Sequence, residues 1–492
     1  MSAAAAAAVA LGVAACTITD AAQSSDSGDD RTPASGPADE LTAVDPDTIP
    51  GLEEDGAEDE GGGVSVTLSY PVIPNADPLA ERLAQIAERD AADFAGAVPG
   101  AEGVSIDWQI SAAGDGVIAV RLTQEETGSE GDRTGYSTYW YDTSDGHTAA
   151  STELLAGDAE LADLHALVRA ALEDTDGVDT SAIQPIARVY DSMGFNPDGD
   201  LVVEFDEGQV APLDAGRIRA VVPGADADPL LSEFGERAQE AAVGVTPEFA
   251  VDEPPTVPKD DPYPPAPGTS PGAAGDDVDC TAAGSKCVAL TFDDGPGERT
   301  GEVLDALAEH DAKATFFVTG GPVGQHPGLV RRAFADGHEI GNHTVGHPDL
   351  AGLGAGGIRA ELDPVTDVVR RETGYTMDLM RPPYGSTNGT VEEVTRDLGT
   401  AQILWSVDTR DWKDRDADKV ADRAVSGAAP GAIILMHDIH DSTVDAVPDI
   451  VERLDEKGYT MVTTSQLLGD TEPGNAYLDA VPEADGAGDG EG

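Results

Sequence analysis

The sequence predicts an α/β fold: a distorted (β/α) barrel of about seven strands, preceded by an α+β domain. The first observation is that, from residue 287 onward, short apolar runs alternate with longer amphipathic stretches. This alternation is typical of parallel strands joined by helices, and about seven such units can close or nearly close a barrel. The second observation is that strand-like runs in the N-terminal half follow one another with few helical stretches between them, which favours an α+β domain.

The barrel elements are expected in a regular order. The expected strands cover residues 288–292, 314–318, 338–341, 377–380, 402–407, 432–436 and 459–463. The expected helices cover residues 301–310, 329–336, 358–372, 391–398, 419–426 and 444–457. Each expected strand before the last is followed by one expected helix, so the strands should run parallel.

The α+β domain is expected over residues 63–245. Val64, Val66 and Leu68 alternate with polar residues, as in a half-buried strand. A helix follows, because apolar residues recur at helical spacing between residues 79 and 94. Further strands are expected at 104–110, 116–123, 136–141 and 201–205, and a second helix at 159–172.

Composition divides the rest of the chain into connecting segments. Residues 17–62 are acidic and poor in large apolar side chains, and we expect a disordered tether. Residues 246–278 are rich in proline and predict a semi-rigid linker, which places the barrel domain at residues 279–470. Residues 471–492 are acidic and glycine-rich, and we expect a disordered tail.

The net charge of the 492-residue chain is −66. A surface this acidic repels phosphate backbones, so we expect no nucleic-acid partner. It also repels anionic lipid head groups, so a membrane contact would need a separate anchor.

The three cysteines divide into a lone residue and a pair. Residues 1–16 are expected to be a signal peptide, because a run of small apolar residues ends in Val13-Ala14-Ala15-Cys16. This ending resembles a bacterial lipobox, which implies a lipid on Cys16. Cys280 and Cys287 lie just before the first barrel strand, and in an exported protein such a pair predicts a disulfide.

Reactive side chains follow the expected barrel strands where each strand ends. Because the carboxyl ends of parallel strands share one rim of a barrel, side chains distant in sequence should converge there. The residues at these positions are Asp293, Asp294, His343, His347, Arg381, Asp411, Trp412 and His437.

Three of these residues form a candidate metal site. His343 and His347 are four residues apart, so both imidazoles can face one point if the segment makes a helical turn. With the carboxylate of Asp294 they make a three-ligand set that suits zinc best, although cobalt, nickel or manganese would also fit. A metal ion in such a set lowers the pKa of bound water from about 15.7 to roughly 7, which favours hydrolysis.

The neighbouring residues suit acid–base chemistry. Asp293 can act as a base, and Arg381 can orient it and keep it ionised. His437 can donate a proton to a leaving group if it is charged. Asp411 can support that charge.

The same residues stand in five ordered motifs that resemble those of the NodB-type polysaccharide deacetylases, carbohydrate esterase family 4. The motifs are Thr291-Phe292-Asp293-Asp294-Gly295-Pro296, His343-Thr344-Val345-Gly346-His347, Arg381-Pro382-Pro383-Tyr384, Asp408-Thr409-Arg410-Asp411-Trp412 and Leu435-Met436-His437.

The resemblance implies a distorted (β/α) barrel and metal-dependent removal of acetyl groups from sugars. It implies the same base, acid and metal ligands, adds the backbone N–H of Tyr384 as an oxyanion donor, and places Trp412 and Leu435 around the acetyl group. The fourth motif holds two aspartates, Asp408 and Asp411, and adjacency to Trp412 favours Asp411.

The N-terminal domain resembles the extracytoplasmic domain of RsiV-type anti-sigma factors. The resemblance rests on Tyr139-Trp140-Tyr141-Asp142, on Gly146 and on the segment from Phe195 to Leu201. It implies lysozyme as a partner of this domain; the alternative is a packing domain without a ligand.

These expectations combine into an exported, lipid-anchored enzyme at the outer face of the bacterial plasma membrane. Its expected substrate is peptidoglycan, deacetylated at N-acetylglucosamine or N-acetylmuramic acid. Two alternatives remain: a deacetylase of chitin oligomers or xylan, and a lysozyme-binding surface sensor whose deacetylase fold is secondary.

Overall fold

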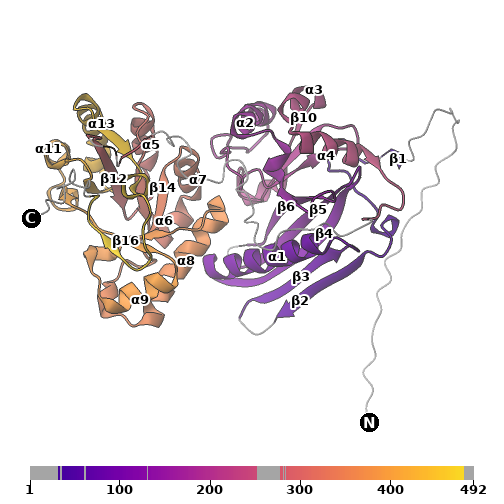
Figure 1. Cartoon of the computed structure of the whole chain (residues 1–492), viewed down its shortest axis with the longest axis horizontal. Helices are drawn as coiled ribbons and strands as arrows, with labels where there is room; N and C mark the ends of the chain where they lie inside the picture. Colours follow the sequence, from indigo (N-terminus) through magenta and orange to yellow (C-terminus); the bar gives the residue numbers. More distant parts are fainter. Residues whose placement is uncertain are drawn as a thin grey trace, which may run out of the picture.

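The computed structural model describes residues 32–33, 36–59, 63–129, 131–251, 278–280, 282 and 284–480. The described chain forms two regions that lie side by side, an N-terminal region up to residue 251 and a barrel region from residue 278 (Figure 1). The expected signal peptide, with Cys16, lies outside the described residues. None of the helices within the described ranges has the length and apolar character needed to span a membrane.

The N-terminal region is built on a six-stranded sheet in the order β2-β3-β4-β5-β6-β7. Only β3 and β4 are parallel to each other, because the long helix α1 (Asp77–Ala97) connects them. Leu83, Ile86 and Phe94 of α1 are buried against the sheet, as their spacing predicts. The strands are β2 (Glu53–Asp59), β3 (Ser65–Val72), β4 (Ala101–Gly114), β5 (Val117–Gly128), β6 (Arg133–Asp142) and β7 (Thr148–Ala150).

A second layer of the N-terminal region contains a three-stranded antiparallel sheet in the order β10-β9-β8. Trp140 of β6 is fully buried there and meets the ring of Phe195 edge to face at 6.0 Å. The sequence predicts β9 and α2 but misses β8, β10 and α4. The elements are β8 (Ser192–Phe195), β9 (Leu201–Phe205), β10 (Ile218–Val222), α2 (Asp158–Leu172) and α4 (Glu233–Val243).

The barrel region contains a curled parallel sheet, which confirms the predicted fold class. Its path through the described residues is β17-β18-β12-β13-β14-β15-β16-β20, and β19 pairs with the start of β12. The strands are β12 (Cys287–Asp293), β13 (Thr315–Val318), β14 (Glu339–Asn342), β15 (Leu379–Met380), β16 (Ala401–Ile403), β17 (Val407–Asp408), β18 (Ile433–His437), β19 (Thr460–Val462) and β20 (Ala476–Tyr477).

Helices cover the outside of this sheet, and their apolar faces make the largest buried cluster of the region with β12, β13 and β18. The longest is α8, which ends at Gly374 in the left-handed conformation that favours glycine. The helices are α5 (Thr300–Ala308), α6 (Gly320–Gln325), α7 (Pro327–Ala335), α8 (Ala355–Thr373), α9 (Gly389–Asp397), α10 (Asp411–Asp414), α11 (Ala417–Gly427), α12 (Asp441–Val444), α13 (Val447–Glu456) and α14 (Thr464–Leu468).

The prediction of one continuous strand at residues 402–407 is wrong. The structure divides this segment into β16, which pairs with β15, and β17, which pairs with β18 at the opposite end of the sheet. The chain between them spans the opening of the barrel. An uninterrupted apolar run cannot reveal that its two halves pair with different neighbours, because the pairing depends on distant strands.

Three segments predicted to be disordered or extended contain structure. In the expected tether, β2 pairs with β3, although all seven of its residues are exposed. In the expected linker, Phe249 and Val251 are buried beside α1. In the expected tail, β20 pairs with β16. The composition argument fails at these places because backbone pairing and a few anchoring side chains suffice for order.

The disulfide predicted between Cys280 and Cys287 is present. It joins the segment that enters the barrel to the first residue of β12. Cys287 is buried, and it packs with Val462 and Leu467 at the start of the barrel strands.

The two regions meet along α8, which lies beside α1 (Figure 1). Arg371 of α8 makes a two-pronged ion pair with Glu126 of β5, at 2.6 and 2.8 Å, and both side chains are buried. Arg370 pairs in the same way with Asp93 of α1. Apolar contact adds to these pairs, because Phe334 of α7 packs into the core of the N-terminal region.

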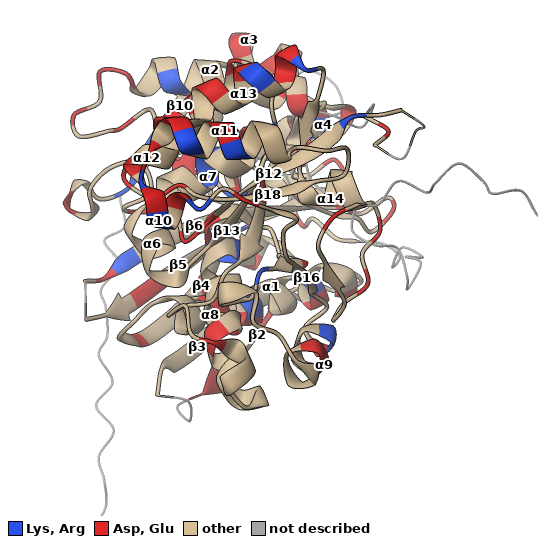
Figure 2. Cartoon of the chain, turned by 90° about the vertical axis from the view of Figure 1, so that its left-hand side faces the viewer, with Lys and Arg blue, Asp and Glu red and all other residues tan. Residues whose placement is uncertain are grey.

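The negative charge is spread over the molecule. Figure 2 shows Asp and Glu on many helices and loops, with Lys and Arg interspersed, rather than gathered into one acidic face.

Candidate active site

The reactive residues named from the sequence lie together at the carboxyl ends of the barrel strands. Asp293 ends β12, and β12 and β18 are paired so that Asp293 stands opposite His437. Asn342, at the end of β14, stands opposite Met380, so His343 and Arg381 follow neighbouring strands. The strand placement predicted from the sequence therefore brings these residues to one edge of the sheet.

Asp294, His343 and His347 are close enough to share one ion. One ligand atom from each lies within 4.8 Å of the others. The Nε2 atoms of His343 and His347 are 3.5 and 3.4 Å from Oδ1 of Asp294. Two imidazole nitrogens and a carboxylate oxygen suit a divalent transition metal with open positions.

The chain also prepares His343 for that task. Its Nδ1 lies 2.7 Å from the carbonyl oxygen of Arg381, a contact that places the ring proton on Nδ1 and leaves Nε2 free as a ligand. Burial lowers the pKa of His343, although the neighbouring carboxylates of Asp293 and Asp294 oppose this. The neutral form, which is the ligand form, is therefore favoured.

The spacing of the two histidines suggests a helical turn, but the structure shows none at this place. They lie on a loop in which Thr344 and His347 have φ angles of 71° and 56°. Asp294 has a φ of 72°, so its side chain turns away from that of Asp293 and toward the histidines. These left-handed residues cost conformational energy, which is typical of functional sites.

Asp293 is held by the fully buried guanidinium of Arg381. Nη1 of Arg381 donates to Oδ1 of Asp293 at 2.8 Å and to Oγ1 of Thr291 at 2.7 Å. The other nitrogens donate to the carbonyl oxygens of Ile403 and Leu404, where β16 ends. Arg381 thus fixes Asp293 and satisfies the carbonyl groups at the opening of the barrel.

His437 and Asp411 form the second pair of the site. Nδ1 of His437 lies 2.9 Å from Oδ1 of Asp411, and the backbone N–H of His437 donates to Oδ2. Thr443 also donates to Oδ2 of Asp411. Asp408 instead accepts the backbone N–H of Arg410, so the structure favours Asp411 of the fourth motif, as expected.

The electrostatics of this pair favour a charged imidazole. Burial opposes the charge of His437, but the hydrogen bond and charge of Asp411, with the charges of Asp293 and Asp294, raise its pKa to about 9. Burial alone would raise the pKa of Asp411, yet its hydrogen bonds with His437 and Thr443 hold it below the usual value. The contact with Asp411 therefore favours the protonated form of His437, which can donate a proton.

The three residues assigned to substrate contact differ in exposure. Tyr384 and Trp412 are 70% and 50% exposed, whereas Leu435 is buried in β18. The ring of Tyr384 meets that of His347 edge to face at 4.7 Å. The exposed ring of Tyr384 beside His347 offers a face on which a sugar ring can rest. Trp412 directly follows Asp411, the partner of His437.

Sequence reasoning missed three residues of the site. Thr443 anchors Asp411, Asp438 lies buried beside Gly295, and His440 stacks on His437. A usable signal exists for His440 and Thr443, because they follow His437 by three and six residues where a helix begins.

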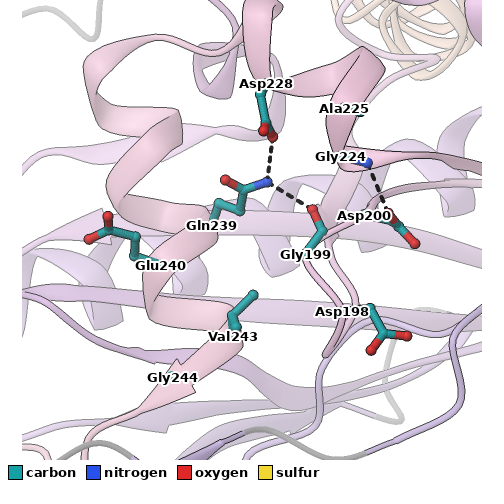
Figure 3. A pocket seen from close by; sticks show the side chains of 10 residues that line it. All are labelled: Asp198, Gly199, Asp200, Gly224, Ala225, Asp228, Gln239, Glu240, Val243 and Gly244. Atoms are coloured by element: carbon teal, nitrogen blue, oxygen red, sulfur yellow. Dashed lines mark hydrogen bonds between the residues drawn. The ribbon is translucent and has the colours of Figure 1, made fainter. Parts of the chain in front are cut away.

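A separate hollow lies away from these residues, in the N-terminal region (Figure 3). Its volume is 710 Å³, and its walls come from the loop at Asp198–Asp200 and from α4. Two of its carboxylates are already engaged, because Asp200 accepts the N–H of Gly224 and Asp228 accepts from Gln239. These two carboxylates therefore stabilise the local structure around the hollow.

The fold and the site together define a barrel protein with a single-metal type of site at the carboxyl ends of its strands. The family model of polysaccharide deacetylase matches residues 281–403. A chitooligosaccharide deacetylase of Rhizobium leguminosarum bv. trifolii is 36% identical over 192 residues, which cover 36% of this chain and 89% of that protein. The chain therefore belongs to the polysaccharide deacetylase family.

Other relatives carry cell-wall names. Peptidoglycan-N-acetylglucosamine deacetylase PgdA of Listeria monocytogenes is 42% identical over 197 residues, 40% of this chain and 42% of that protein. Peptidoglycan-N-acetylmuramic acid deacetylase PdaC of Bacillus subtilis is 39% identical over 183 residues, 37% of this chain and 38% of that protein. The chain thus matches less than half the length of these two relatives.

Among solved structures, a chain described as "T48 deacetylase with substrate" is 44% identical. It covers 41% of this chain and 99% of its own length, with a TM-score of 0.39.

Proposed function

We propose that this protein is a metal-dependent N-deacetylase of cell-wall polysaccharide. It would hydrolyse the acetamido group of N-acetylglucosamine or N-acetylmuramic acid in peptidoglycan, giving a free amine and acetate. One observation carries the proposal: a metal-type ligand set, a carboxylate held by arginine and a charged histidine held by aspartate converge on one rim.

Each group has a distinct task. A divalent ion held by Asp294, His343 and His347 would polarise the acetyl carbonyl and activate water. Asp293, fixed by Arg381, accepts a proton from the attacking water. His437 donates its proton to the departing amine nitrogen, so that the C–N bond breaks and acetate and amine are released. The backbone N–H of Tyr384 is proposed as a donor to the developing oxyanion, with Trp412 and Leu435 beside the methyl group.

Zinc is proposed as the metal, because two imidazoles and one carboxylate are a common zinc set; cobalt, nickel and manganese are the alternatives. Metal analysis of purified protein, followed by chelation and reconstitution with each ion, tests this assignment. Restored activity with zinc at least equal to that with the other ions is expected. Activity restored only by another ion contradicts the choice of zinc.

The substrate is tested by measuring acetate release from purified peptidoglycan, chitin oligomers and acetylated xylan, each with and without a chelator. We expect release from peptidoglycan that the chelator abolishes. Faster release from chitin oligomers or xylan would favour those alternative substrates. No release from any of them would favour the lysozyme-binding sensor.

The roles of base and acid are tested separately from metal binding. Asp293→Asn and His437→Ala should each lower turnover by roughly 10²–10⁴-fold, while the metal content stays at the wild-type level. Asp294→Ala is the matched control and should lose the metal. Metal loss in the His437 variant, or full activity in the Asp293 variant, contradicts the assigned roles.

We further propose that the N-terminal region is an RsiV-like domain that binds lysozyme. The five carboxylates of the exposed edge strand β2 support this proposal, since lysozyme is basic and charge complementarity speeds association. Titration of the full chain with lysozyme at low salt is expected to give saturable binding. Neutralising Glu53, Glu54 and Asp55 as Gln, Gln and Asn should weaken it, and equal binding by that variant would exclude β2 as the contact.

Finally, we propose that the protein is exported and held at the outer face of the plasma membrane by a lipid on Cys16. Incorporation of a clickable fatty acid into the wild type, but not into a Cys16→Ser variant, is expected. Equal labelling of the two proteins would exclude Cys16 as the lipid site.

A further inference from the structure

We propose that His440 is a positioning residue for His437: its imidazole stacks on the ring of His437 and holds that ring in the plane that meets Asp411. The inference rests on the proposed function only for the role of His437 as proton donor.

The two imidazoles are stacked with an inclination between their planes. Their centroids are 5.6 Å apart and their planes differ by 29°. The turn between β18 and α12 brings them together, because the backbone N–H of His440 donates to the carbonyl oxygen of His437 at 3.3 Å. The stacking is thus a consequence of the spacing of three residues at the start of a helix.

The stacking of His440 on His437 restrains a tilting of the His437 ring that the hydrogen bond to Asp411 does not prevent. That bond fixes one edge of the His437 ring, at Nδ1. Tilting of the ring about this edge would turn Nε2 away from the leaving group. An aromatic ring against the face of His437 opposes the tilt, and it also limits the access of water to the Asp411 bond.

The electrostatics suit a neutral ring at this place. Burial lowers the pKa of His440, and the nearby charges of Arg415 and protonated His437 lower it further, against the opposing charge of Asp411. A neutral aromatic face beside an imidazolium is attractive, whereas a second positive charge would be repelled. His440 can therefore support the charged form of His437 without competing for its proton.

The kinetic test compares His440→Phe, which keeps a flat ring but cannot titrate, with His440→Ala, which removes the ring. Both are assayed in the metal-loaded full chain on an N-acetylglucosamine oligomer and on 4-nitrophenyl acetate. The amine must be protonated as it leaves, whereas 4-nitrophenolate leaves without a proton.

We expect His440→Ala to lower kcat on the oligomer about tenfold, which is less than the loss expected when the proton donor itself is removed. The KM for the oligomer and the rate of ester hydrolysis should not change. His440→Phe should keep most of the wild-type kcat on the oligomer. Equal losses on both substrates, or full oligomer activity in the alanine variant, would overturn the proposal.

A second test does not depend on deacetylase activity. The proton on Nδ1 of His437, shared with Asp411, gives a downfield NMR resonance that is observed only if its exchange with water is slow. We expect this resonance in the wild type and in His440→Phe, and its loss in His440→Ala at the same pH. Persistence in the alanine variant would overturn the positioning role, even if the wild type proves inactive on every acetylated sugar.

Discussion

At the residue scale, the site contains two ion pairs, one built around a fixed arginine and one around a buried aspartate. Arg381 keeps Asp293 in place, and each of its three guanidinium nitrogens donates a hydrogen bond inside the protein. Asp411 is a buried carboxylate that keeps His437 charged. A base and an acid can therefore coexist on one rim at neutral pH, because each has its own fixed partner.

The Asp411–His437 pair predicts the alkaline limit of activity. His437 donates only when protonated, so turnover should fall as the pH rises through its pKa of about 9. Asp411→Asn removes the negative charge that raises this pKa. The alkaline limb should then move to lower pH, by about 1–2 units, in the pH dependence of kcat.

Asp408→Asn is the matched control for this measurement. Asp408 lies in the same motif, but within the described part of the chain its carboxylate accepts a hydrogen bond from the backbone N–H of Arg410 and has no bond to His437. Its substitution should leave the alkaline limb in place. A limb that stays fixed in the Asp411 variant, or moves equally in both variants, would show that Asp411 does not set the pKa of His437.

At the scale of elements, α8 connects the metal site with the N-terminal region. In the first half of α8, Glu361 accepts a hydrogen bond from the backbone N–H of Gly346, which lies between His343 and His347. Near its end, Arg370 and Arg371 reach the N-terminal region. The same helix therefore braces the histidine loop and carries the interface between the two regions.

The buried pair Arg371–Glu126 predicts how strongly this interface contributes to stability. Arg371→Leu leaves the carboxylate of Glu126 buried without its partner and should lower the free energy of unfolding by about 3–5 kcal/mol. Arg359→Leu, on an exposed part of α8 and paired with Asp397, should change it by less than about 1 kcal/mol. Chemical denaturation followed by circular dichroism measures both.

A double variant sharpens this test. Glu126→Leu combined with Arg371→Leu removes both charges and should recover much of the lost stability, because no unpaired charge stays buried. Equal destabilisation by Arg371→Leu and Arg359→Leu would mean that the two regions do not depend on the ion pair.

At the scale of the whole molecule, the net charge of −66 works against the compact state. The acidic residues are spread over the surface, so their repulsion is relieved by screening rather than by any single substitution. Raising the salt concentration from about 0.01 to 0.15 M shortens the Debye length from about 30 to 8 Å. The thermal midpoint should rise over this interval, measured by calorimetry.

Further salt, from about 0.15 to 1 M, shortens the screening length only from about 8 to 3 Å. The second rise should therefore be smaller than the first. A midpoint that falls with added salt over the first interval would show that attractive ion pairs outweigh the general repulsion.

The sequence by itself determined the main alternation of strands and helices in the barrel, apart from the division into β16 and β17 and the added strand β20, and it determined which residues meet at the rim. It could do so because the carboxyl ends of parallel strands share one side, so Asp294, His343 and His437 are brought together by any closed or nearly closed arrangement. The disulfide was likewise predictable, since Cys280 and Cys287 are close in the chain.

Only the tertiary structure decided where the barrel opens, which splits one apolar run into β16 and β17. It also decided that Arg381 bridges that opening, that β2 and β20 are ordered, and that α1 docks on α8. These features depend on pairing and ion pairs between residues far apart in the chain. Local composition indicates which secondary structure a segment favours, but not which distant segment it pairs with. That distant segment supplies the hydrogen bonds and charges that keep it ordered.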